Sequence, residues 1–151
     1  MKVLIVNGPN INMLGVREPD IYGAASFDDL QDFIRGAARE LGIEPTLFQS
    51  NCEGAIIDAI QGALGKYDGI VINPAAYAHT SIAMADALKA VAIPAVEVHL
   101  TDINLREQYR RISYTSEACL KTICGKGFMG YRGALAAVRD AHHAAACSGR
   151  S

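Results

Sequence analysis

Short runs of apolar, often β-branched residues recur along the chain, and between them lie longer stretches in which apolar residues return every three or four positions. The short runs predict five strands, over residues 2–7, 43–49, 69–73, 95–99 and 120–125. Their middles are almost entirely apolar, as in strands that are buried on both faces of a sheet. The alternation therefore indicates a parallel sheet wrapped by helices.

The longer stretches carry helix-capping signals at their starts. Ser26 precedes two acidic residues and an amphipathic pattern, which predicts a capped helix. Ser50 and Glu53 repeat the capping-box spacing ahead of a second helix. Two more helices are expected over residues 81–91 and 131–145, with only a short helical turn between the last two strands. This order predicts an α/β flavodoxin-like three-layer sandwich with a five-stranded parallel sheet.

The composition fits a single domain, because half of the 151 residues are hydrophobic and a fifth are charged. We expect this domain to span residues 1–146 and residues 147–151 to form a frayed tail. A net charge of -2 provides no positive field for nucleic acid. No run is long enough for a membrane span, no leader pattern opens the chain, and the four widely spaced cysteines suggest reduced thiols, so a cytoplasmic protein is expected.

The connection after the first predicted strand, residues 7–26, is much longer than usual for this fold class. Ligands of such sheets bind beyond the carboxyl ends of the strands, so residues 10–25 are expected to form a lid. Arg17 precedes Tyr22 by five residues. A tyrosine acts as a base near neutral pH only where a cation or donor stabilises its phenolate, and Arg17 is the candidate. The alternative is an exposed arginine and a tyrosine whose ring fills the core.

Two further strand ends carry polar residues. Asn73 and His79 flank the loop after the third predicted strand, while Glu97 and His99 lie on one face of the fourth. A nearby carboxylate fixes the tautomer of an imidazole and favours its protonated form, which suits proton transfer. Purely structural roles are the alternative. A zinc site built from His79, Glu97 and His99 is a weaker one, because no metal-binding motif is present.

Two other motifs have simpler explanations. Residues 125–130 match the Gly-x-Gly-x-x-Gly fingerprint, but no strand with an acidic residue follows, so we interpret them as a tight turn into the last helix. Arg106, Arg110 and Arg111 follow the fourth predicted strand, and such clusters are usually solvated. Their place beside the predicted cleft also suits binding of an anion.

Several motifs in order resemble the type II 3-dehydroquinate dehydratases, over about residues 2–139. The motifs are Asn7-Gly8-Pro9-Asn10, Arg17-Glu18-Pro19 with Tyr22-Gly23, Phe48-Gln49-Ser50-Asn51 with Glu53-Gly54, Asn73-Pro74-Ala75 with His79-Thr80-Ser81, and Glu97-Val98-His99-Leu100 with Arg106-Glu107 and Arg110. The resemblance implies a hydro-lyase without metal or cofactor. It implies anti elimination of water from 3-dehydroquinate to 3-dehydroshikimate through an enolate, in aromatic biosynthesis or quinate breakdown.

The resemblance also assigns catalytic roles. It implies that Tyr22 removes the proton beside the ketone and that Arg17, on the lid, holds Tyr22 as a phenolate. Asn12 would position a water that bonds to the enolate oxygen. His99, oriented by Glu97, would protonate the departing hydroxyl.

Binding roles follow from the same resemblance. Asn73, His79 and Arg110 would contact substrate hydroxyls, and the backbone N–H groups of Leu100 and Thr101 would hold the carboxylate. Asp86 would reach the site of a neighbouring subunit, because members of this family form dodecamers assembled from trimers.

The sequence departs from the family pattern at four positions. The family usually has Ser at Thr101, Asn at Asp102, His at Asn104 and Arg at Ala85. Two other functions are therefore weighed, a related lyase for another cyclic hydroxy-keto acid and a module that only binds a small carboxylate. The presence of both proposed proton-transfer pairs, Arg17 with Tyr22 and Glu97 with His99, favours an enzyme.

Overall fold

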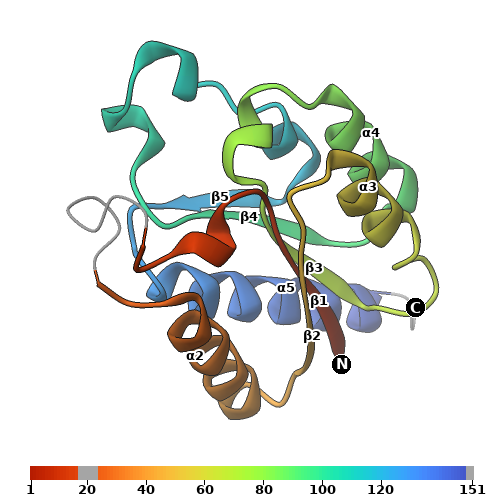
Figure 1. Cartoon of the computed structure of the whole chain (residues 1–151). Coiled ribbons are helices and arrows are strands. Elements are labelled where there is room, and N and C mark those ends of the chain that lie inside the picture. The colour runs from red at the N-terminus through yellow and green to blue at the C-terminus, as the bar shows by residue number, and fades with distance from the viewer. Residues whose placement is uncertain (17–23, 149–151) are drawn as a thin grey trace.

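A five-stranded parallel sheet runs through the centre of the molecule (Figure 1). The computed structural model describes residues 1–16 and 24–148. The strands are β1 (Lys2–Asn7), β2 (Glu44–Gln49), β3 (Gly69–Asn73), β4 (Ala95–His99) and β5 (Lys121–Cys124). They pair in the order β2-β1-β3-β4-β5, all in parallel, so the flavodoxin-like fold is confirmed.

Helices cover both faces of the sheet. The helices α2 (Phe27–Glu40) and α5 (Met129–Ser148) lie on one face, and α3 (Glu53–Gln61) and α4 (Ile82–Val91) on the other (Figure 1). Alternate residues of β1 supply the two cores, as with Ile5 towards α2 and α5, and Val6 towards α3 and α4. Among the described residues, no helix combines the length and apolar character needed to cross a membrane.

Only one of the two expected capping boxes forms. The Ser26 hydroxyl accepts from the Asp29 N–H, while the Asp29 carboxylate accepts from the Ser26 N–H at 2.7 Å, as predicted. The second box, Ser50 with Glu53, is wrong. The helix begins at Glu53, so Ser50 lies too far before it, and the Ser50 hydroxyl instead accepts from the Cys52 N–H at 3.0 Å.

The connection between β4 and β5 is richer than the single helical turn expected. It contains three 3-10 helices, η3 (Ile103–Leu105), η4 (Gln108–Arg110) and η5 (Thr115–Ala118). At the other end of the domain, α5 continues through Ser148, so the first two residues of the expected frayed tail are helical. Residues 149–151 lie outside the described part of the chain.

Candidate active site

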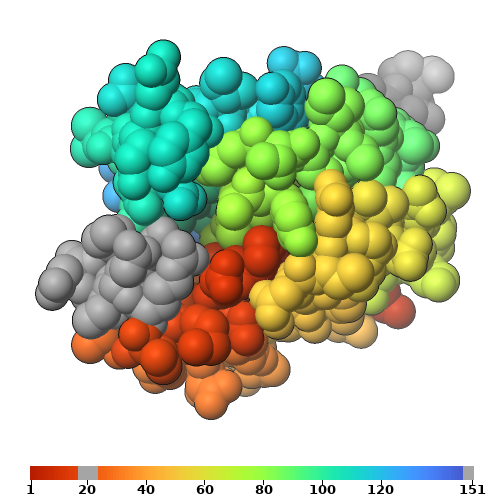
Figure 2. All heavy atoms as spheres, turned by 45° about the horizontal axis from the view of Figure 1, so that its top comes forward, coloured from red at the N-terminus to blue at the C-terminus, as the bar shows by residue number. Residues whose placement is uncertain are grey.

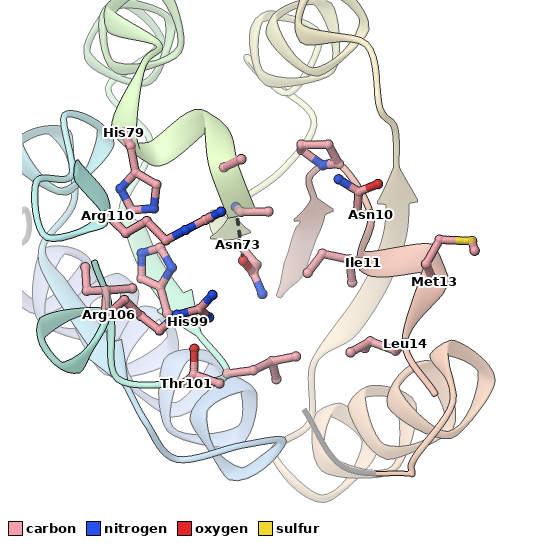
Figure 3. A pocket seen from close by; sticks show the side chains of 15 residues that line it. Asn10, Ile11, Met13, Leu14, Asn73, His79, His99, Thr101, Arg106 and Arg110 are labelled. Carbon is pink, nitrogen blue, oxygen red and sulfur yellow. Dashed lines mark hydrogen bonds between the residues drawn. The ribbon is translucent and has the colours of Figure 1, made fainter. Parts of the chain in front are cut away.

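A pocket opens at the carboxyl ends of β1, β3 and β4, beside the point where the strand order reverses. Its walls come from the segment after β1, the segment after β3 and the connection after β4, including two arginines of that connection (Figure 3). Figure 2 shows the corresponding orange-red, green and cyan segments gathered on one face of the molecule. Ligands of doubly wound sheets bind at this position.

A buried imidazole and carboxylate form the deepest polar pair of the site. Their spacing of two residues along β4 places Glu97 and His99 on the same face of the sheet, and both side chains are almost fully buried. His99 Nε2 lies 2.6 Å from Glu97 Oε1. Because a carboxylate can only accept, Nε2 carries a hydrogen, and Nδ1 is the atom through which His99 can exchange a proton with another molecule.

Glu97 is held as a carboxylate by several donors. Burial alone raises its pKa, but the hydrogen bond and charge of His99, with the hydroxyls of Thr115 and Ser113, outweigh burial and bring the pKa below its ordinary value. A carboxylate beside an imidazole stabilises the positive charge that the ring carries when it acts as a general acid. The pair is therefore suited to proton transfer.

His79 lies above His99 in the pocket wall. The two rings are nearly parallel, with centroids 6.4 Å apart. His79 Nδ1 lies 2.6 Å from the carbonyl oxygen of Ile112, so this nitrogen carries a hydrogen and donates it. The contact fixes the ring. Nε2, the other ring nitrogen, is then an acceptor that can bond to a hydroxyl group.

Asn73 is positioned by a buried tyrosine that the sequence interpretation missed. Asn73 Oδ1 accepts from the Ala75 N–H, drawn as a dashed line in Figure 3, and Asn73 Nδ2 donates to the Tyr131 hydroxyl at 2.9 Å. Tyr131 in turn donates to Asn7 Oδ1 at 2.6 Å. Burial raises the pKa of Tyr131 far above its ordinary value, so this hydroxyl stays neutral and the amide orientation of Asn73 is fixed.

Two arginines bring positive charge to the pocket. The Nε atoms of Arg106 and Arg110 lie 3.4 Å and 3.3 Å from one carboxylate oxygen of Glu107. The Arg110 contact has the length of an ion pair without the alignment of a hydrogen bond. Both side chains line the pocket and are largely buried, which suits a polar or anionic ligand.

In the segment after β1, the structure favours Asn10 over Asn12 as the residue whose side-chain amide lines the pocket. Asn10 lines the pocket in a left-handed conformation with φ of 66°, and its N–H donates to Asn51 Oδ1 at 2.9 Å. Asn12 is not among the described residues that line the pocket, and its Oδ1 accepts from Gln49. Asn12 is exposed, and its side chain contacts Gln49 at the end of β2 instead.

The remaining candidates are divided between the pocket and the surface. Leu100 and Thr101 line the pocket beside His99. Asp86 is exposed on α4 and is not among the lining residues that the structure describes. Arg17 and Tyr22 lie outside the described residues.

The described residues contain no group of three His, Cys, Asp or Glu side chains arranged to hold a metal ion. The zinc site considered from the sequence would use His79, Glu97 and His99. Both carboxylate oxygens of Glu97 already accept hydrogen bonds from protein groups. Those bonds tie Glu97 to His99 and to two hydroxyl groups.

Comparison with known proteins places the chain in a family. A sequence model of the dehydroquinase class II family matches residues 1–139. A 3-dehydroquinate dehydratase of Clostridium acetobutylicum is 52% identical over 140 residues, covering 93% of this chain and 97% of the relative. A Geotalea daltonii protein of the same name is 51% identical over 138 residues, covering 91% and 96%.

Solved structures agree with the sequence relatives. The type II dehydroquinase of Butyrivibrio crossotus superposes with a TM-score of 0.90 at 46% identity, covering 92% of this chain and 97% of that chain. The type II dehydroquinase of Propionibacterium acnes gives a TM-score of 0.88 at 40% identity, covering 92% and 96%. The chain therefore belongs to the class II dehydroquinase family.

Proposed function

We propose that the pocket removes water from 3-dehydroquinate to give 3-dehydroshikimate, by anti elimination through an enolate. Family membership and relatives of 52% identity that carry the name 3-dehydroquinate dehydratase support this activity. The observation that carries it is the buried His99–Glu97 pair, which presents the imidazole of His99 to the pocket and suits proton transfer.

The first step takes the proton beside the ketone. Tyr22 acts as the base, and the guanidinium of Arg17 stabilises its phenolate form, as the resemblance implies. The two electrons of the broken C–H bond form the enolate. Such a proton is more acidic than an ordinary C–H, but its removal still requires a strong base and charge stabilisation at the oxygen.

The enolate oxygen requires a hydrogen-bond donor. We assign to Asn10 the role that the resemblance gave to Asn12, in which the side-chain amide positions a water that bonds to this oxygen. The pocket position of Asn10 and the outward position of Asn12 support the reassignment. The backbone of Asn10 is in a left-handed conformation and is anchored by its N–H on Asn51.

The second step expels the hydroxyl group. His99 donates its Nδ1 proton to the leaving oxygen, the C–O bond breaks, and the enolate electrons form the new double bond with release of one water. Glu97 stabilises the positive charge of His99 before this step and holds the ring throughout. No metal or cofactor takes part in the proposed sequence.

Neighbouring groups bind the rest of the substrate. Asn73, His79 and Arg110 contact its hydroxyls, and the backbone N–H groups of Leu100 and Thr101 hold its carboxylate. The presence of all five residues around one pocket supports this arrangement. The positive charges of this region favour an anionic substrate.

We also propose that the protein works as a homo-oligomer, with trimers assembled into a dodecamer. Asp86 is exposed on α4, away from the pocket of its own chain, as expected if it serves a neighbour. Large apolar side chains are exposed on the connection after β4, with Leu105 at 83%, Tyr109 at 67% and Ile112 at 59%. Exposed apolar side chains in one segment support a protein–protein interface there.

A cytoplasmic location is part of the same proposal. All four cysteines are free, which is compatible with a reducing compartment. The reaction would serve aromatic biosynthesis or quinate breakdown.

A direct assay tests the proposed function. Purified protein is mixed with 3-dehydroquinate, with and without a chelator, and the enone absorbance of the product is followed. We expect turnover in both, a loss of about 100-fold or more in His99→Ala, and no loss in the control His143→Ala, an exposed histidine of α5. Absence of turnover in the wild type, with tight binding of the substrate retained, would favour the carboxylate-binding module instead.

A further inference from the structure

Two hydroxyl groups from the connection between β4 and β5 reach the buried carboxylate of Glu97. Ser113 Oγ donates to Glu97 Oε1 at 2.8 Å, and Thr115 Oγ1 makes a short bond to Oε2. Thr115 is fully buried, as is Glu97, although the two residues are 18 positions apart. Neither hydroxyl lines the pocket.

The donors are divided unequally between the two oxygens of Glu97. Oε1 accepts from His99 and from Ser113, whereas Thr115 is the one hydrogen-bond donor to Oε2 found within the described residues. A buried carboxylate oxygen without a donor is strongly unfavourable while it is charged. Thr115 therefore stabilises the oxygen that would otherwise be the natural place for a proton.

The His99–Glu97 pair shares one proton between two arrangements. In one, Glu97 is ionised and His99 is cationic; in the other, both are neutral. Hydroxyls that donate to the carboxylate favour the charged arrangement, because a hydrogen bond to an ionised acceptor is stronger than one to its protonated form. Thr115 and Ser113 thus act on where the proton lies without touching the substrate.

We propose that Thr115, assisted by Ser113, is a positioning residue that keeps Glu97 ionised and thereby keeps on His99 the proton that the elimination consumes. This inference rests on the proposed function for the use of that proton. The ionisation of Glu97 itself is a property of the substrate-free protein.

Other titratable and charged groups also lie near the His99–Glu97 pair. Burial, with the charge of Glu97, raises the pKa of Cys119 to about 12. Burial also raises the pKa of Cys124 on β5, so both thiols are neutral. His79 stacks on the ring of His99. The guanidinium groups of Arg106 and Arg110 line the same pocket and pair with Glu107. From β3, the neighbour in register with Glu97 is the apolar Ile72.

Removal of the Thr115 hydroxyl has a defined direction. It takes away one of the contributions that lower the pKa of Glu97, while burial, which raises that pKa, stays. The pKa therefore rises. Because turnover requires ionised Glu97, activity is lost as pH falls through this pKa, so the acid limb of the pH profile moves to higher pH.

Infrared difference spectroscopy measures the step directly, through the protonated carboxyl band of Glu97, assigned by its loss in Glu97→Gln. In Thr115→Val, which keeps the size and branching of the side chain, we expect the midpoint of this band to rise by about one to two pH units. The acid limb of kcat/KM should shift with it. Thr115→Ser should restore both.

A matched control separates the hydroxyl from the local structure. Ser116 donates to the Ser113 carbonyl within the same turn and does not contact Glu97, so Ser116→Ala should leave the midpoint unchanged. If Thr115→Val does not fold, Ser113→Ala should give a shift in the same direction.

An unchanged Glu97 midpoint in folded Thr115→Val would overturn the inference, as would an equal shift in Ser116→Ala. The infrared measurement uses protein without substrate. It therefore tests the role of Thr115 even if the wild type fails to convert 3-dehydroquinate. Failure of turnover alone would count against the proposed function. An unchanged midpoint of the Glu97 band in Thr115→Val alone would count against the role of Thr115.

Discussion

The hydroxyl of Tyr131 lies between two asparagine amides at the carboxyl ends of β1 and β3. It donates to Asn7 and accepts from Asn73, and the Ala75 N–H fixes the other end of the Asn73 amide. A reversed Asn73 amide would lose both contacts. The orientation that Asn73 presents to a substrate hydroxyl is therefore decided outside the pocket, by a side chain of α5.

Tyr131→Phe tests this dependence. The ring can still pack, but two buried amides lose a partner, so we expect the free energy of unfolding to fall by about 1–3 kcal/mol. The KM for 3-dehydroquinate should rise several-fold. Denaturant unfolding and steady-state kinetics measure the two effects. The control is Tyr67→Phe, whose ring packs on the core beneath α3 and α4. A Tyr131→Phe enzyme with unchanged KM would show that Asn73 is oriented by other contacts.

Asp102 adds a negative charge beside the proposed carboxylate site. Its Oδ1 accepts from the N–H and the side-chain amide of Asn104 at 2.9 Å and 3.0 Å, so it caps η3. Asparagine in its place keeps an acceptor for this cap. The substitution therefore changes the charge with little effect on the turn.

We expect Asp102→Asn to lower the KM for 3-dehydroquinate with little change in kcat, because bound substrate and transition state carry the same carboxylate. Two unit charges about 8 Å apart repel by roughly 2 kcal/mol at an effective dielectric of about 20, which is about 30-fold, and screening by water and salt reduces the expected gain to about tenfold. It should shrink as ionic strength rises. Asp58→Asn, exposed on α3, is the control. An unaltered KM at low salt would mean that the charge of Asp102 is not felt by the substrate.

Elements were predicted well where they are buried on both faces. The bounds of β1, β3 and β4 agree with the predicted ranges because a doubly covered strand is a nearly continuous apolar run, interrupted in β4 by Glu97. The connection after β4 carries no such periodicity. Its three 3-10 helices depend on local turns and on contacts with the sheet, which one-dimensional patterns do not record.

The same distinction applies to the site. The Glu97–His99 pair was predictable because strand alternation places both side chains on one face. Thr115 and Tyr131 reach the site from 18 and 58 positions away from their partners, and no local pattern indicates such contacts. The resemblance gave this role to Asn12, and the sequence does not show which side of a short 3-10 helix faces a pocket, so the proposed reassignment to Asn10 depends on the structure.

The contact between β3 and α5 leaves no room for a side chain at Gly69. A Cβ added there would lie 1.9 Å from Val138 Cγ1, so the Val138 side chain must change its rotamer or the strand and helix must move apart. We expect Gly69→Ala to lower the free energy of unfolding by about 1–3 kcal/mol, measured by denaturant unfolding. Gly36→Ala is the control, because nothing lies within 4 Å of its added Cβ on α2, and it should stabilise the protein by about 0.5–1 kcal/mol. Equal stability of Gly69→Ala and wild type would mean that Val138 or the two elements can adjust without cost.

At the scale of the whole molecule, the exposed apolar side chains after β4 and the position of Asp86 predict an assembly. Light scattering on the purified protein should give a mass of at least three protomers, and twelve if trimers associate further. Asp86→Ala should reduce turnover while leaving this mass intact. A fully active monomer would contradict both the assembly and the role of Asp86.

The hydrogen bond from Tyr131 to Asn7 joins residues 124 positions apart, the first strand to the last helix. During synthesis, β1 leaves the ribosome long before α5 exists, and every strand of the sheet is complete before Tyr131 can reach its place. A nascent chain that has all of its proposed catalytic residues therefore still lacks the contact that orients Asn73. The ability to bind substrate should therefore appear late, when α5 docks against the sheet and Tyr131 reaches Asn7 and Asn73.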